Sequence, residues 1–122
     1  MTFKSVLIAM LLLMSAPALT HEVEKGPNGG RVVDAGAVHI ELAVKETSIE
    51  VFVSDTNDKP LPAKGFKGIA ILTVGGKAHR IVLEAKNGSR LVGTAPVKIA
   101  GVPRGVVQLT GPDGKTAQAR FK

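Results

Sequence analysis

Short runs in which every second residue is apolar recur along the chain from residue 31 onwards. The alternation is clearest in 38–42 (VHIEL), 49–53 (IEVFV) and 117–121 (AQARF). Side chains of a β-strand point alternately to its two faces, so a period of two predicts strands with one buried face. Beyond the first 18 residues, no stretch sustains apolar residues at helical spacing without an interrupting Gly or Pro. The pattern therefore excludes a mainly helical fold.

Turn signals separate these runs about every ten residues. The signals are Gly-Gly at 75–76, Asn-Gly at 87–88 and GPDG at 111–114. All three are typical of tight turns between antiparallel strands. The run 68–74 (GIAILTV) is apolar on both faces, which predicts a central strand. About seven or eight short strands over 31–122 predict an all-β domain, and more narrowly an immunoglobulin-like β-sandwich.

The first 18 residues are typical of a secretory signal peptide. Lys4 precedes an unbroken apolar run over 6–14, and small residues follow at 15–18. The run is shorter than the roughly 20 residues that span a bilayer. We predict cleavage after Ala18, or as late as Thr20, and a flexible Gly- and Pro-rich lead-in over 19–30. The mature protein is then periplasmic and has no transmembrane segment.

Composition excludes several kinds of site. The chain has no Cys, and all three Met lie in the predicted signal peptide. Disulfides, thiolate metal sites and thiol nucleophiles are therefore excluded, and a soft Cu(I) site is disfavoured. The net charge of +6 comes from scattered Lys and Arg, without Tyr or Trp, so we expect no nucleic-acid partner.

An enzyme is also not expected. The sequence has no glycine-rich phosphate loop and no nucleophile elbow. Acidic pairs such as Asp55 and Asp58 lie in predicted loops, where solvated charge is the usual outcome. A small exported enzyme is therefore the least favoured interpretation of the function.

His21 lies beside the predicted cleavage site. Cleavage after Ala18 would place it third in the mature chain. The new amine, two backbone amides and the imidazole can then form a square-planar site that suits Cu(II) or Ni(II). Cleavage after Thr20 would instead make His21 terminal, and its amine and ring could chelate one metal ion. The alternative is a chance histidine in a loose leader.

His39 and Glu41 are two residues apart on a predicted strand, so we expect them on the same face. They can form half of a metal site, or Glu41 can orient the ring of His39. The alternative is an exposed polar face with no ligand. His79 shares a face with Ile81 and Leu83 and is expected at the edge of the core.

Five short motifs follow one another between residues 26 and 68: GPNGGR at 26–31, VHIEL at 38–42, EVFVSD at 50–55, KP at 59–60 and KGFKG at 64–68. Together they resemble segments near the N-terminus of periplasmic adaptor subunits from heavy-metal efflux pumps, and also a group of small exported bacterial proteins. The resemblance covers roughly His21 to Thr94. Asn28 departs from it, because the adaptor segments often carry His there, in a GPHGG run. Asn is a poorer metal ligand than His.

The resemblance implies an exported β-domain connected with the handling of copper, zinc, cobalt or nickel. The residues that match are His21, His39 and Glu41, together with the glycine-rich lead-in. We therefore predict a periplasmic binding protein that handles Cu(II), Ni(II) or Zn(II) in support of metal efflux or resistance. The alternative is an interaction module without metal, which docks to a transporter, adaptor or other envelope protein through a sheet face or edge.

Overall fold

The computed structural model describes residues 24–122, which form nine β-strands and no helix. The prediction of an all-β fold is confirmed. The predicted signal peptide lies outside the described residues. No helix in the described part of the chain has the length and apolar character needed to span a membrane. The strands are β1 (Glu24–Lys25), β2 (Arg31–Asp34), β3 (His39–Lys45), β4 (Ser48–Ser54), β5 (Lys67–Val74), β6 (Lys77–Ala85), β7 (Arg90–Thr94), β8 (Arg104–Thr110) and β9 (Thr116–Phe121).

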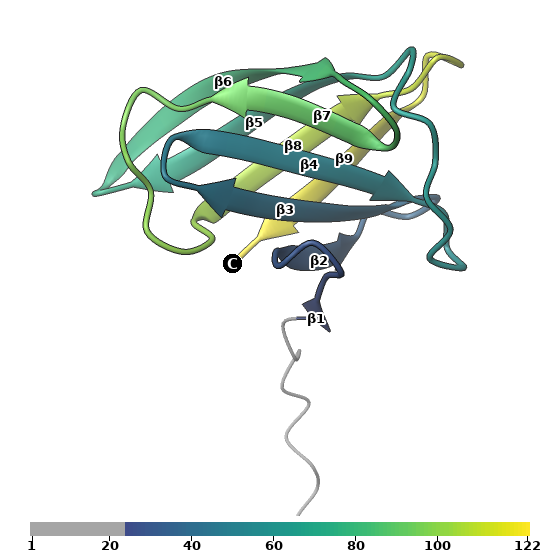
Figure 1. The fold of residues 1–122 in the computed structure, drawn as a ribbon. Coiled ribbons are helices and arrows are strands. Elements are labelled where there is room, and N and C mark those ends of the chain that lie inside the picture. Colours follow the sequence, from purple (N-terminus) through teal and green to yellow (C-terminus); the bar gives the residue numbers. More distant parts are fainter. Residues whose placement is uncertain (1–23) are drawn as a thin grey trace, which may run out of the picture.

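All nine strands belong to one antiparallel sheet, in the order β1-β2-β3-β4-β7-β6-β5-β8-β9. Figure 1 shows this sheet curled into a half-barrel. Two pairings, β4 with β7 and β5 with β8, join strands that are distant in the sequence. Glu84 opposite Val92 and Ala85 opposite Leu91 connect β6 to β7. The order thus gives no support to the two separate sheets of an immunoglobulin-like sandwich, and that finer prediction stays a prediction.

The hydrophobic core lies inside the curl of the sheet. In β4 the alternation has the predicted effect, because Ile49, Val51 and Val53 are buried while the residues between them are partly exposed. Leu72 occupies the equivalent inner position of β5. Burying one such aliphatic side chain stabilises the fold by about 1.5–3 kcal/mol relative to leaving it exposed. The largest fully buried side chain is that of Phe121, in β9.

The curl brings β2 and β9 together, although they lie near opposite ends of the strand order. No strand pairing links them within the described residues. Instead, Nη2 of Arg31 donates a hydrogen bond to the carbonyl oxygen of Lys122, at 2.8 Å. A side chain therefore connects the two ends of the curled sheet.

The Gly75-Gly76 turn between β5 and β6 has the predicted form. Both glycines have positive φ values, 58° and 79°. This is the left-handed conformation that a two-residue hairpin with a type I′ turn requires, and glycine adopts it without steric cost. The hairpin pairs β6 with β5 over the whole length of β5.

Candidate functional site

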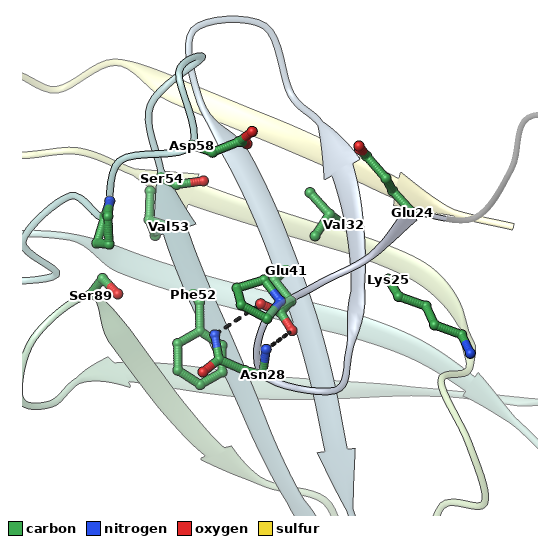
Figure 2. A pocket seen from close by; sticks show the side chains of 12 residues that line it. Glu24, Lys25, Asn28, Val32, Glu41, Phe52, Val53, Ser54, Asp58 and Ser89 are labelled. Atoms are coloured by element: carbon green, nitrogen blue, oxygen red, sulfur yellow. Dashed lines mark hydrogen bonds between the residues drawn. The ribbon is translucent and has the colours of Figure 1, made fainter.

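A hollow of about 250 Å³ opens where the N-terminal strands meet the β4–β5 connection. Figure 2 shows the side chains around it, which come from β1 to β4, the turn between β1 and β2, the loop after β4 and the β6–β7 loop. The charged members are Glu24, Lys25, Glu41 and Asp58. Two of the residues expected to form a metal site, His39 and Glu41, lie on β3 at this end of the molecule.

Glu41 is the one charged side chain in the buried set of the described chain, with an exposed fraction of 4%. Its Oε2 accepts hydrogen bonds from the backbone N–H groups of Asn28 and Gly30, each at 2.9 Å. Its Oε1 accepts a third bond, from the side-chain amide of Asn28 at 2.9 Å (Figure 2). A buried carboxylate is costly unless such donors satisfy it. Glu41 therefore anchors the turn over 26–30 to β3.

Steric contacts and backbone conformation explain why the turn over 26–30 contains three glycines. A Cβ on Gly26 would collide with the carboxyl group of Glu41, and a Cβ on Gly30 would collide with the backbone carbonyl of Leu42. Gly29 has open space beside it but a φ of 79°. The turn is closed by a hydrogen bond from the N–H of Gly26 to the carbonyl of Gly30, at 2.9 Å. Close approach to β3 therefore requires glycine at two positions, and backbone conformation favours it at a third.

The lead-in expected to be flexible over 19–30 is thus attached to the sheet from Glu24 onwards. Glu24 and Lys25 form β1, which pairs with β2, and the next residues wrap the carboxylate of Glu41. The polar, Gly- and Pro-rich composition is typical of a free linker. Here the buried carboxylate of Glu41 on β3 accepts hydrogen bonds from the segment, and a free linker has no such partner.

We predict that Gly30→Ala lowers the free energy of unfolding by about 2 kcal/mol, because its Cβ would force β2 away from β3. Gly29→Ala is the matched control. It meets no atom and should cost about 1 kcal/mol from backbone strain alone. Urea denaturation of both variants measures the difference. A Gly30→Ala variant as stable as Gly29→Ala would contradict the close approach of the two strands.

His39 has a different partner from Glu41. Its Nδ1 lies 2.9 Å from Oδ1 of Asp58, in the loop after β4. The hydrogen bond to Asp58 raises the pKa of His39 above its ordinary value of 6.5, and the charges of Asp34 and Glu24 raise it further, although burial acts in the opposite direction. The acid that orients the ring is therefore Asp58, and Glu41 is occupied elsewhere.

Asp58 was expected to be a solvated loop charge, and its side chain is 80% exposed. Its position beside His39 follows from the turn that carries it. The carboxylate of Asp55 accepts hydrogen bonds from the N–H groups of Asn57 and Lys59, at 2.8 and 2.9 Å. Asp58 itself has a φ of 63°, in the left-handed region. The only sequence signal for this arrangement is the run DTNDKP at 55–60, which predicts a turn and says nothing of His39.

We predict that Asp58→Asn lowers the pKa of His39 towards its ordinary value, because the ring loses its charged acceptor. NMR titration of the His39 ring protons measures this shift, and Asp113→Asn is a control that should leave it unchanged. With a raised folded-state pKa, the pair stabilises the fold fully below pH 6.5, and that stability is lost as the pH rises through the folded-state pKa. An unchanged pKa in Asp58→Asn would refute the assigned bond.

Of the three expected ligands, the structure places His39 and Glu41 on β3, each with its own partner. His21 lies outside the described residues. Within 24–122, no three His, Asp or Glu side chains are grouped closely enough to hold a metal ion by themselves. His79 is partly exposed on β6, which agrees with its expected place at the edge of the core. What the site does offer is one oriented imidazole in an acidic surrounding.

Comparison of the chain with protein-family models, with curated proteins and with solved structures finds no match.

Proposed function

We propose that this protein is an exported binding protein that takes up divalent transition metal ions at His39, weakly and reversibly. The observation that carries the proposal is the contact between Nδ1 of His39 and Oδ1 of Asp58, at 2.9 Å. Histidines that bind metals usually donate the other ring N–H to a carboxylate, which fixes the tautomer and the ring orientation. With Nδ1 donating to Asp58, Nε2 is the nitrogen that can bind the metal.

The charges around His39 also favour a cation. Asp34 lies directly opposite His39 in the β2–β3 pairing, and its charge, like that of Glu24, acts on the ring. A local cluster of carboxylates attracts divalent ions even in a chain whose net charge is +6. One imidazole with carboxylate and water ligands suits Zn(II), Ni(II) or Cu(II). Such a small ligand set supports transient handling of the ion.

The proposed ligand set differs from the one expected from sequence in one respect. Both oxygens of Glu41 already accept hydrogen bonds from the 26–30 turn, so a metal ion there would have to displace three N–H donors. We therefore assign Glu41 to the turn and leave it out of the site. His21, with the mature amino terminus, stays a proposed ligand and precedes Glu24 by three residues in the chain.

The cellular part of the proposal is supported by the sequence. The first 18 residues have the features of a signal peptide, and the motifs from 26 to 68 resemble those of heavy-metal efflux adaptors. We propose a periplasmic location, a role in metal efflux or resistance, and an efflux-system or envelope protein as recipient of the ion. The proposal does not depend on whether the curled sheet is classed with immunoglobulin-like sandwiches.

The test is calorimetric titration of the exported protein, with its cleavage site fixed by intact mass, against Zn(II), Ni(II) and Cu(II). We expect saturable binding that His39→Ala abolishes. Asp58→Asn should weaken it about tenfold, as loss of an orienting partner does. His79→Ala is the matched control and should have no effect.

Two outcomes would contradict the proposal in different ways. Binding that survives His39→Ala but is lost in His21→Ala would move the site to the amino terminus. No saturable binding of any of the three ions would reject metal handling altogether, and would favour the alternative of a docking module.

A further inference from the structure

The outward face of β5 and its neighbours is more apolar than a solvent-exposed sheet surface usually is. Four side chains form its centre, here called the aliphatic patch: Ile69, Ile71, Val82 and Val106. Ile71 is 46% exposed and Val82 is 55% exposed. The run 68–74 predicted a central strand because it is apolar on both faces, yet in the structure only the inner face is buried in the core.

The pairing register shows that the patch is continuous. Ile69 lies opposite Val82 of β6, and Ile71 lies opposite Val106 of β8. Side chains directly opposite each other on one face of a sheet are in contact distance. A hollow of about 480 Å³ adjoins Ile69 and Val82. The patch thus adjoins a depression that can receive a side chain.

Three arginines border the patch on the same face. Arg80 lies opposite Ile71, Arg120 lies opposite Val106, and Arg104 lies opposite Thr73. All three are exposed, and none forms a salt bridge within residues 24–122. The one acid at these outward positions, Glu84, lies opposite Lys67. The border is therefore strongly positive.

We propose that this face of β6, β5, β8 and β9 docks an acidic protein surface that has an aliphatic centre. Exposed apolar surface with a polar border is typical of interaction sites. The planar guanidinium of Arg binds carboxylates through two parallel hydrogen bonds, so an arginine border favours Asp and Glu on the partner. Proteins that bind at a membrane surface usually add Trp or Tyr, and this chain has neither.

The docking face and the proposed metal site share no residue, because the patch and its arginines lie on β5, β6, β8 and β9, whereas His39 lies on β3 and Asp58 in the loop after β4. The two proposals can therefore be tested independently. Substitutions at Arg80 or Arg120 should not alter metal binding. Conversely, His39→Ala should not alter docking.

The probe is a short helical peptide with Leu along one face and Glu on both flanks, titrated into isotope-labelled protein and followed by NMR. We expect the largest shifts at Ile71, Val82 and Val106. The double charge reversal Arg80→Glu/Arg120→Glu should weaken binding by at least about tenfold. The matched control Lys45→Glu/Lys98→Glu changes the net charge equally, at exposed positions away from the patch, and should have a much smaller effect.

Three further measurements complete the test. A peptide with Lys in place of Glu, and one with Ala in place of Leu, should both bind at least about tenfold more weakly than the probe. Shifts located elsewhere, or equal loss in both double variants, would overturn the proposal. Tighter binding of phosphatidylglycerol vesicles than of the peptide, through the same arginines, would replace the acidic protein by a membrane surface.

Discussion

Glu41→Ala is expected to lower the free energy of unfolding by about 4 kcal/mol, since a hydrogen bond to a charged group contributes roughly 1.5–3 kcal/mol. The substitution removes the acceptor of three N–H groups, two from the backbone and one from the side chain of Asn28. The N–H of Gly30 would be left buried without a partner. Chemical denaturation measures the loss, and amide exchange should show that the turn over 26–30 opens first.

Two control variants distinguish the loss of the hydrogen bonds that anchor the turn from the loss of a carboxylate as such. Glu41→Gln keeps an acceptor for the backbone groups, and the amide of Asn28 can turn over to accept from the new amide, so the cost should be about 1 kcal/mol. Glu50→Ala removes a carboxylate from the neighbouring strand, and its one ion pair within residues 24–122, with Arg90, is long at 3.7 Å. It should change stability by less than about 0.5 kcal/mol. A Glu41→Ala variant no less stable than Glu50→Ala would refute the anchor.

The same contacts give a role to the residue that departs from the adaptor motif. Asn28 stands where those segments often carry His, and it was interpreted as a weakened metal ligand. In the structure its side-chain amide donates to Oε1 of Glu41, at 2.9 Å. A histidine ring also has an N–H to donate. We infer that position 28 supports the turn and need not bind metal.

Local patterns were sufficient to predict most of the strands, but not β1, which lies in the segment expected to be a flexible lead-in. Alternation placed β3, β4 and β9, and the Gly-Gly doublet placed the β5–β6 hairpin. These features depend on residues close together in the chain. The single curled sheet was not predicted, because it depends on the pairing of β4 with β7 and of β5 with β8. Alternation shows which face of a strand is buried and does not show which strand pairs with it.

The candidate site was predicted only in part, for a related reason. His39 and Glu41 were selected from their spacing on one predicted strand, and both lie on β3, but the partner of His39 is 19 positions away in the sequence and those of Glu41 are 13 and 11 positions away. The donors to Glu41 are largely backbone N–H groups, which every residue except Pro has and no motif distinguishes. The GPNGG run was the available signal. It indicates a tight turn, and only the folded structure shows the buried carboxylate against which it closes.

Phe121→Ala is expected to lower the free energy of unfolding by about 4 kcal/mol, which is typical of removing a buried aromatic side chain. Phe121 is 1% exposed and is the largest fully buried side chain of the described chain. It lies opposite Gly105 of β8, where a Cβ would collide with the backbone of Ile71. A larger side chain at position 105 therefore cannot fill the space that Phe121→Ala leaves. Chemical denaturation measures the loss.

Removing the side chain of Phe121 should also affect β2, near the other end of the curled sheet. The next residue, Lys122, accepts the hydrogen bond from Arg31 that connects β9 to β2. Amide exchange in Phe121→Ala should therefore increase in β2 as well as in β8 and β9. Phe66→Ala is the matched control, because Phe66 packs only partly buried against the core and should cost roughly half as much. Equal losses of unfolding free energy in the two variants would contradict the full burial of Phe121. Unchanged amide exchange in β2 would mean that β9 does not hold the ends of the curled sheet together.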